Sequence, residues 1–323
     1  MEIEIVTRLY GGKANMRREL LARNGLTDDP QTEQTVLLWD NTELVATGSR
    51  QGNLLKCLAV DETRQGEGLT ATLLTELRRE AFACGYRHLF LYTKPKNRVL
   101  FSSLFFYPVA QTDDVLLMEN KQNGIQSFLN DLALPSHESG AGAIVMNCDP
   151  FTLGHRYLIE NAARECPHLY IFVLSEDKGR FSAADRLQMV RNGTADLPNV
   201  TVFPTGPYLI SSATFPTYFL KDQGAAGEIQ CRLDIEIFAA YYAPHFGITR
   251  RYVGEEPLCA VTRQYNAALK EYLPLDVVEV PRLEKGNAPV SAGAVRRLLD
   301  SGDIESACTL VPHTTTAFFR TEE

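Results

Sequence analysis

Hydrophobic and polar residues in the first third of the chain alternate in a way that predicts short strands around one long helix. Three apolar runs predict strands at Thr35–Trp39, Leu44–Ser49 and Asn53–Val60. Apolar residues four apart then predict a helix over Leu69–Cys84, which Gly85 ends. A strand at Arg87–Thr93, a helix or turn near Val99–Leu104 and a strand at Asp114–Glu119 follow. This order is typical of a mixed α+β domain.

The second half of the chain has a different pattern, in which short and almost continuously apolar runs alternate with helical segments. Such runs predict strands buried on both faces, as in a parallel sheet covered by helices. The predicted strands are Ala143–Cys148, Leu169–Ser175, Val200–Pro204, Arg250–Gly254 and Asp276–Val280. Helices are predicted over Gly154–Glu165 and from a cap at Ser182 to about Ala195.

The segment between residues 125 and 142 separates these two patterns, and its end is rich in Gly, Ser, Pro and His. This composition is typical of a domain boundary. We therefore predict a first domain over residues 1–130, a linker over 131–142 and a second domain over 143–323. A chain of 323 residues is long enough for two separate cores.

Charge and composition exclude several classes of protein. The net charge of −8 is opposite to the basic surface that a nucleic-acid-binding protein needs. No apolar stretch approaches the roughly 20 residues that cross a bilayer, and the N-terminus carries Glu2 and Glu4 where a targeting signal is basic. The seven cysteines are scattered and never spaced as C-x-x-C, so no disulfide framework or zinc site is supported. We expect a cytoplasmic protein with no nucleic-acid or membrane partner.

The loop after the first downstream strand, NCDPFTLGH, has the residues that a phosphate group needs. Gly154 allows the backbone to approach a phosphate, and the helix that begins here presents free N–H groups and a partial positive charge. His155, in the first helical turn, can donate a hydrogen bond to a phosphate oxygen. The alternative is that Thr152 only caps the helix and His155 is a polar surface residue.

The string DPFTLGH resembles the T/H-x-G-H motif of the nucleotidyltransferase superfamily, whose domains have a Rossmann-like parallel sheet. The resemblance implies that Thr152 and His155 contact the phosphates of ATP as catalytic residues. It also implies that the rest of the loop lies in the ATP site, namely Asn147, Asp149, Pro150, Phe151 and Gly154.

Three weaker motifs of the same superfamily follow. Lys178 stands where relatives have a phosphate-binding lysine, and the resemblance implies that it is a catalytic residue. Arg180 is the near alternative. The segment from Ser291 to Arg296 resembles an I-S-S-x-x-x-R signature, although Ala292 replaces its second serine, and both named residues are implied to bind ATP. Gly254 and Glu255 match a V-G-E-E turn that lines the nucleotide pocket in relatives.

The N-terminal domain contains a second glycine-rich turn before a helix, which is a general anion-binding arrangement. The turn resembles the pyrophosphate loop of GNAT acetyltransferases and implies a binding site for a CoA-like group at Gln65, Gly66, Gly68 and Thr70. Phe101 stands where many of these enzymes have a tyrosine as general acid, and Phe105 replaces a glycine. A phenyl ring has no proton to donate, so we expect a binding surface without the usual acid.

The order of these motifs over nearly the whole chain resembles the citrate lyase ligase family, most closely in NCDPFTLGHRYLIENAA, YLISSATFPTYFL and RYVGEEP. The resemblance implies an acid–thiol ligase that converts ATP and acetate to acetyl-AMP and pyrophosphate. The acetyl group would then pass to the thiol of the phosphoribosyl-dephospho-CoA group on the citrate lyase acyl carrier subunit, with release of AMP. Mg²⁺ is expected on the triphosphate, and no motif fixes its ligands.

Two other functions stay open at this point. The chain could transfer AMP to a phosphorylated acceptor, or it could be a non-enzymatic sensor of an adenine nucleotide or CoA. The acetate pocket is not identified by a motif; Ser211, Ser212 and Thr214 are small polar candidates that could equally cap a helix.

Overall fold

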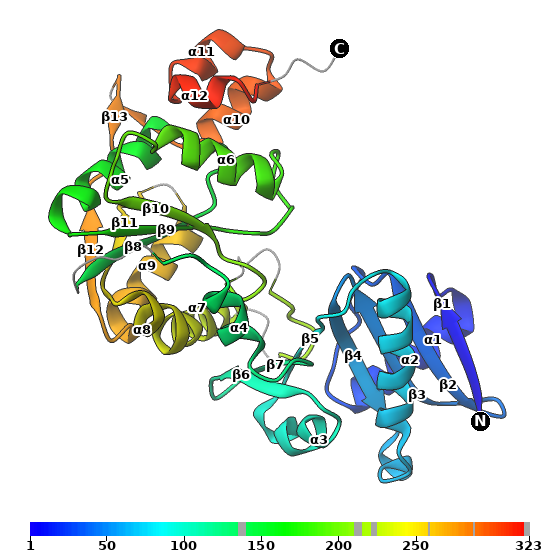
Figure 1. Ribbon diagram of the computed structural model, residues 1–323. Coiled ribbons are helices and arrows are strands. Elements are labelled where there is room, and N and C mark those ends of the chain that lie inside the picture. The colour runs from blue at the N-terminus through cyan, green and yellow to red at the C-terminus, as the bar shows by residue number, and fades with distance from the viewer. Residues whose placement is uncertain (135–139, 210–214, 221–224, 258, 287, 320–323) are drawn as a thin grey trace. The chain divides into compact units, whose positions relative to one another are not determined.

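The computed structural model describes residues 1–134, 140–209, 215–220, 225–257, 259–286 and 288–319 (Figure 1). The chain forms two compact units, one of Met1–Gly124 with Phe215–Ile229 and one of Ile125–Thr214 with Gln230–Glu323. The first unit therefore includes a segment from far downstream, which the sequence pattern did not indicate. The division into residues 1–130, 131–142 and 143–323 stays a prediction, because part of the linker lies outside the described residues.

The first unit is built on a mixed seven-stranded sheet in the order β1-β2-β3-β4-β5-β7-β6. Every neighbouring pair is antiparallel except β4 and β5, which pair in parallel over only two residues of each strand. Its strands are β1 (Glu2–Val6), β2 (Gln34–Asp40), β3 (Glu43–Gln51), β4 (Leu54–Val60), β5 (Phe90–Thr93), β6 (Tyr107–Gln111) and β7 (Leu116–Glu119), and its helices are α1 (Gly11–Arg23), α2 (Leu69–Ala83) and α3 (Arg98–Ser103).

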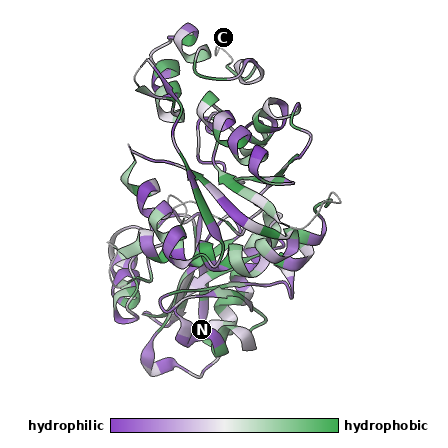
Figure 2. Cartoon of the chain, turned by 90° about the vertical axis from the view of Figure 1, so that its left-hand side faces the viewer, coloured by the Kyte–Doolittle hydropathy of each residue, from purple (hydrophilic) through white to green (hydrophobic). Residues whose placement is uncertain are grey.

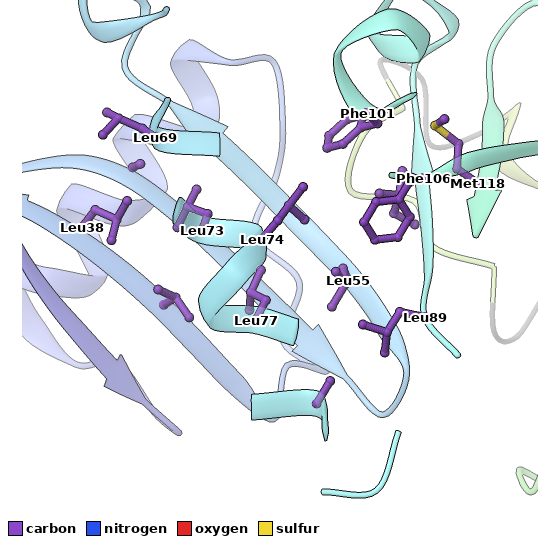
Figure 3. Close-up of a cluster of buried hydrophobic side chains, with 14 of the residues drawn as sticks. Leu38, Leu55, Leu69, Leu73, Leu74, Leu77, Leu89, Phe101, Phe106 and Met118 are labelled. Carbon is purple, nitrogen blue, oxygen red and sulfur yellow. The ribbon is translucent and has the colours of Figure 1, made fainter. Parts of the chain in front are cut away.

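The core of this unit forms where α2 packs on the sheet. Leu73 and Leu77, which the fourfold spacing predicted to share a face, are fully buried, and Figure 3 shows them in one cluster with Leu55 of β4. Gly48 of β3 lies under the helix, where an added Cβ would come within 2.9 Å of Leu77 Cδ1. The predicted mixed α+β domain is confirmed, whereas β1, α1 and β6 were not predicted.

The downstream segment of the first unit is held by Tyr218. Its hydroxyl donates to the Tyr92 carbonyl of β5 at 3.0 Å, and its own carbonyl accepts from the Thr27 backbone N–H at 2.8 Å. Burial raises the pKa of Tyr218 well above its ordinary value. The Tyr92 carbonyl lies just beyond Leu91, the last residue of β5 that pairs with β4.

The second unit is built on a five-stranded parallel sheet in the order β10-β9-β8-β11-β12. Its strands are β8 (Ala141–Met146), β9 (Leu169–Val173), β10 (Val200–Pro204), β11 (Ile248–Gly254) and β12 (Asp276–Val280). The chain begins this sheet at its centre, fills one side and then crosses to the other, so the order reverses between β8 and β11. In open parallel sheets, ligands bind at the carboxyl ends of the strands beside such a reversal.

Helices cover both faces of the parallel sheet (Figure 1). They are α5 (Leu153–Glu165) and α6 (Ala183–Gly193) on one face, and α7 (Ala226–Ile237), the π-helical turn Phe238–Tyr242, α8 (Ala243–Phe246) and α9 (Ala260–Tyr272) on the other. Hydrophilic and hydrophobic stretches alternate along these helices (Figure 2). The Rossmann-like prediction for this half is confirmed.

The remaining elements are short. They are the 3₁₀ turns Glu62–Arg64 and Pro95–Asn97, α4 (Gly124–Asn130), β13 (Glu284–Lys285), β14 (Ala288–Pro289), α10 (Ala292–Asp300), α11 (Ile304–Cys308) and α12 (His313–Thr316). No helix within the described ranges is long and apolar enough to cross a membrane.

Candidate active site

A cavity of about 520 Å³ opens at the carboxyl ends of β8, β11 and β12. Residues of α9 and the first turns of α5 and α10 complete its walls. The cavity therefore lies at the strand-order reversal, as the topology of an open parallel sheet predicts. Two helix N-termini at one cavity give two partial positive charges, which favours an anionic ligand.

Thr152 and His155 form a reciprocal cap at the start of α5. The His155 backbone N–H donates to Thr152 Oγ1 at 3.3 Å, and the Thr152 backbone N–H donates to His155 Nδ1 at 3.0 Å. Since Nδ1 accepts this bond, the hydrogen-bond network assigns the imidazole proton to Nε2. Helix capping and phosphate contact are thus compatible roles for these residues, because the cap uses Nδ1 and leaves the Nε2–H group as a donor.

The environment of His155 keeps its imidazole neutral. Burial, followed by the positive charges of Arg282 and Arg296, lowers the pKa of His155 to about 4. The ring also stacks on the fully buried Phe151, with centroids 6.0 Å apart. A neutral imidazole with a fixed tautomer is a hydrogen-bond donor that works without a change of protonation near neutral pH.

This environment has a consequence that NMR can measure. The Cε1–H resonance of His155, assigned by its loss in His155→Ala, is expected to stay in its neutral position from about pH 8 to about pH 5, since an unperturbed histidine titrates near 6.5. Because the folded pKa is the lower one, the stability that this group contributes is complete above about 6.5 and is lost as the pH falls toward 4. A midpoint near 6.5 would contradict the assigned tautomer and burial.

The start of α10 faces the start of α5 across the cavity. Ser291 caps α10 by accepting from the Ala294 backbone N–H at 3.1 Å. Arg296, one turn further, donates to the Asp149 carbonyl and lies 3.5 Å from Asp149 Oδ2. An added Cβ at Gly154 would lie 2.8 Å from the Val290 carbonyl oxygen. Gly154 is therefore needed for the close approach of the two helix starts, a different reason from the phosphate contact that we expected.

Asp149 fastens the loop after β9 to the loop after β8. Its carboxylate accepts from the backbone N–H groups of Arg180 at 3.1 Å and Phe181 at 2.9 Å, and an added Cβ at Gly179 would collide with it. The fully buried Arg186 reinforces this junction by donating to the carbonyls of Asn147, Phe181 and Glu176. Arg186 was not predicted, although its place in SEDKGRFSAADR was a usable signal.

The structure brings some of the predicted nucleotide-site residues together and not others. Those that line the cavity are Asn147, Thr152, Gly154, His155, Gly254, Ser291 and Arg296. Those that do not line it are Asp149, Pro150, Phe151, Lys178, Arg180 and Glu255. Asp149, Pro150 and Phe151 are the buried part of the loop after β8, Lys178 is exposed, and Arg180 forms an exposed ion pair with Asp300.

The sequence analysis missed several residues of the cavity, and three charged ones matter most. Arg282 follows β12 and donates to the Glu255 carbonyl at 2.8 Å and to the Glu256 carboxylate. Glu256, not Glu255, lines the cavity, and its other oxygen accepts from the Cys259 backbone N–H at the start of α9. Arg251 also lines the cavity. It lies inside β11, and the sequence analysis treated this segment only as a strand.

The predicted CoA-like site is an exposed turn before α2. Gly66 and Gly68 have φ of +91° and +78°, a region that favours glycine, and an added Cβ at either position would meet no other atom within 4 Å. Gln65 is exposed and Thr70 is half-buried in the first turn of α2. The turn is open on its outer side, which suits the approach of a phosphate group.

The remaining predicted features concern the acetate pocket, the metal and the position of Phe101. Ser211, Ser212 and Thr214 lie outside the described residues. Within the described part of the chain, no group of three His, Cys, Asp or Glu side chains is placed to hold a metal ion. Phe101, in place of the expected tyrosine, is buried in the core of the first unit.

Comparison with known proteins gives a consistent result. The citrate lyase ligase C-terminal domain matches residues 141–319. The [citrate [pro-3S]-lyase] ligase of Klebsiella pneumoniae is 41% identical over 97% of this chain and 96% of its own length. Those of Escherichia coli K12 and Haemophilus influenzae are 39% and 38% identical over 97% and 94% of this chain and 92% and 94% of their own lengths.

Solved structures match the chain over a smaller part. Escherichia coli ElaA is 15% identical over 37% of this chain and 99% of its own, with a TM-score of 0.33. The ribosomal-protein-S18-alanine N-acetyltransferase of Escherichia coli is 20% identical over 36% of this chain and 92% of its own, with a TM-score of 0.31. The sequence identities over nearly full length decide the family: the chain belongs to the citrate lyase ligase family of acid–thiol ligases.

Proposed function

We propose that this chain uses ATP to activate acetate as acetyl-AMP and then acetylates the thiol of the CoA-like group on the citrate lyase acyl carrier subunit. The observation that carries the proposal is the convergence of two helix N-termini, the Nε2–H of a neutral His155 and Arg296 on one cavity. These groups are donors and positive charges, which is what a triphosphate requires. The names of the relatives supply citrate lyase as the target.

The first step that we propose is attack of an acetate oxygen on the α-phosphorus of ATP. The bond from this phosphorus to the bridging oxygen breaks, and pyrophosphate leaves with the electron pair. Negative charge then builds up on the phosphoryl oxygens and on the leaving group, so positioning and electrostatic stabilisation are the main tasks of the protein. His155 Nε2–H and the positive N-terminal end of α5 would serve the α-phosphate, and Arg296 with the start of α10 would serve the pyrophosphate.

Mg²⁺ would enter this site on the triphosphate. The one carboxylate in the described lining of the cavity, Glu256, is already bound to Arg282 and to the start of α9. This donor set fits an ion that keeps most of its ligands from water and phosphate oxygens. When bound, the ion would neutralise charge on the leaving pyrophosphate.

In the second step that we propose, the carrier thiolate attacks the acetyl carbon. The bond from this carbon to the phosphate oxygen breaks, and AMP leaves with the electron pair. The open turn at Gly66 and Gly68 would bind the phosphates of the CoA-like group, and Gln65 and Thr70 flank it. Lys178 and Arg180 would act only if their loop moves toward the nucleotide, since neither lines the cavity here.

The exchange of labelled pyrophosphate into ATP tests this function. We expect exchange that requires acetate and Mg²⁺, followed by acetylation of the deacetylated carrier subunit with one AMP released per acetyl group. Exchange that requires a phosphorylated acceptor instead of acetate would identify a nucleotidyltransferase. Binding of ATP with no exchange under any condition would identify a nucleotide sensor.

A further inference from the structure

A buried cation lines the cavity away from the helix starts. The side chain of Arg251 is only 2% exposed, and its Nε and Nη1 atoms have no hydrogen-bond partner among the described residues. Leaving a buried guanidinium without acceptors costs far more than leaving a neutral group unpaired. An unpartnered buried cation in the lining of a cavity therefore indicates a ligand that the chain alone does not supply.

The neighbours of Arg251 balance its charge without using its donors. Phe238 packs against it, with the guanidinium carbon 4.5 Å from the ring centroid, which is a cation–π contact. Asp234 interacts with Arg251 electrostatically, but its carboxylate accepts a hydrogen bond from the Tyr265 hydroxyl. Arg251 forms no ion pair within 4.0 Å in the described ranges, so its charge has no acidic partner among the residues beside this cavity.

The position of Arg251 separates it from the groups that we assign to ATP. It lies three residues before Gly254 on β11, which is roughly 10 Å along a strand. His155, Ser291 and Arg296 lie at the helix starts instead. One cavity thus offers two positions for negative charge, one at its two helix starts and one beside an aromatic ring.

The chemistry of the second position matches a small carboxylic acid. A planar guanidinium fork pairs with a carboxylate through two parallel hydrogen bonds, and this geometry does not depend on a helix N-terminus. Tyr265 lines the cavity beside Arg251, and Phe238 packs on the guanidinium outside the cavity lining. We propose that Arg251 binds the carboxylate of the acid substrate and orients it toward the nucleotide. This inference rests on the proposed function, because it names the acid-binding residue of the same site.

Arg250 provides a matched control. It precedes Arg251 on the same strand, and alternate residues of a strand point to opposite faces of the sheet. Its side chain is 44% exposed and reaches toward Asp276 at 3.8 Å. Arg250→Gln and Arg251→Gln therefore each remove one positive charge from the same strand. Only Arg251→Gln removes it from the lining of the cavity.

The test is calorimetric titration of acetate into the full-length protein saturated with α,β-methylene-ATP and Mg²⁺. We expect Arg251→Gln to weaken acetate binding by at least about tenfold, since a charge-assisted bidentate pair is lost, while the affinity for the nucleotide changes less than about twofold. Arg250→Gln should keep both affinities. Unchanged acetate affinity in a folded Arg251→Gln protein, or a larger loss of nucleotide affinity than of acetate affinity, would overturn the inference.

Two further measurements cover other outcomes. If Arg251→Gln does not fold, the unmodified protein is titrated with acetamide, which has the shape of acetate without its charge; binding as tight as that of acetate would overturn the inference. If acetate binds through Arg251 but supports no pyrophosphate exchange, the proposed function fails and the carboxylate site stands. If exchange proceeds and Arg251→Gln retains its acetate affinity, the site assignment fails and the function stands.

Discussion

Replacing His155 with alanine is expected to lower acetate-dependent pyrophosphate exchange by about 10²–10³-fold, the usual cost of losing one donor to a developing oxyanion. The reason is the fixed Nε2–H, which the structure holds by tying Nδ1 to the Thr152 backbone N–H at 3.0 Å. The substitution also removes half of the helix cap, so a loss of about 1 kcal/mol in the free energy of unfolding should accompany it. Exchange kinetics and a melting curve measure the two effects separately.

His155→Glu separates chemistry from capping. A glutamate at this position can accept from the Thr152 backbone N–H, as in an ordinary capping box, but its carboxylate donates no hydrogen bond. We expect the melting temperature to return toward that of the unmodified protein while exchange stays as low as in His155→Ala. His313→Ala, at an exposed position on α12, is the control and should change neither quantity. Near-normal exchange in a well-folded His155→Ala protein would refute the role of the imidazole.

Arg186→Leu is expected to lower the free energy of unfolding of the second unit by about 3 kcal/mol or more, because three backbone carbonyls lose a charged donor where water cannot replace it. Arg186 is fully buried and joins the loop after β8 to the loop after β9 through Asn147, Phe181 and Glu176. Nucleotide binding should be lost with it, since these loops position the start of α5.

The second unit can be followed separately from the first. Hydrogen exchange at the amides of β8 and β9 reports on the second unit, whereas Trp39, the single tryptophan, lies in β2 of the first unit. We expect faster exchange in β8 and β9 with little change in the unfolding transition seen by tryptophan fluorescence. Arg191→Leu, at an exposed position on the same helix, should cost less than about 1 kcal/mol. Equal effects of the two substitutions would show that burial of Arg186 contributes nothing specific.

Much of the fold followed from local patterns in the sequence. The spacing of Leu73 and Leu77, the continuous apolar runs of the second half and the caps at Ser182 and Ser291 each predicted an element that the structure contains. These signals act between residues at most four positions apart, so they can be recognised in the sequence without the tertiary structure. Residues 1–34 lack such a signal: α1 buries only Arg17, Leu20 and Leu21, and β1 is an edge strand with no fully buried residue.

The candidate site was predictable only where its residues are neighbours in the chain. The sequence by itself determined that Thr152, Gly154 and His155 begin a helix after a buried strand, because a cap, a glycine and a helix start are local features. Only the tertiary structure decided that the start of α10 meets them and that Arg251 lines the same cavity. It also decided that Phe215–Ile229 belongs to the first unit. The physical reason is that strand order and helix packing set these contacts, and they depend on burial across the whole chain.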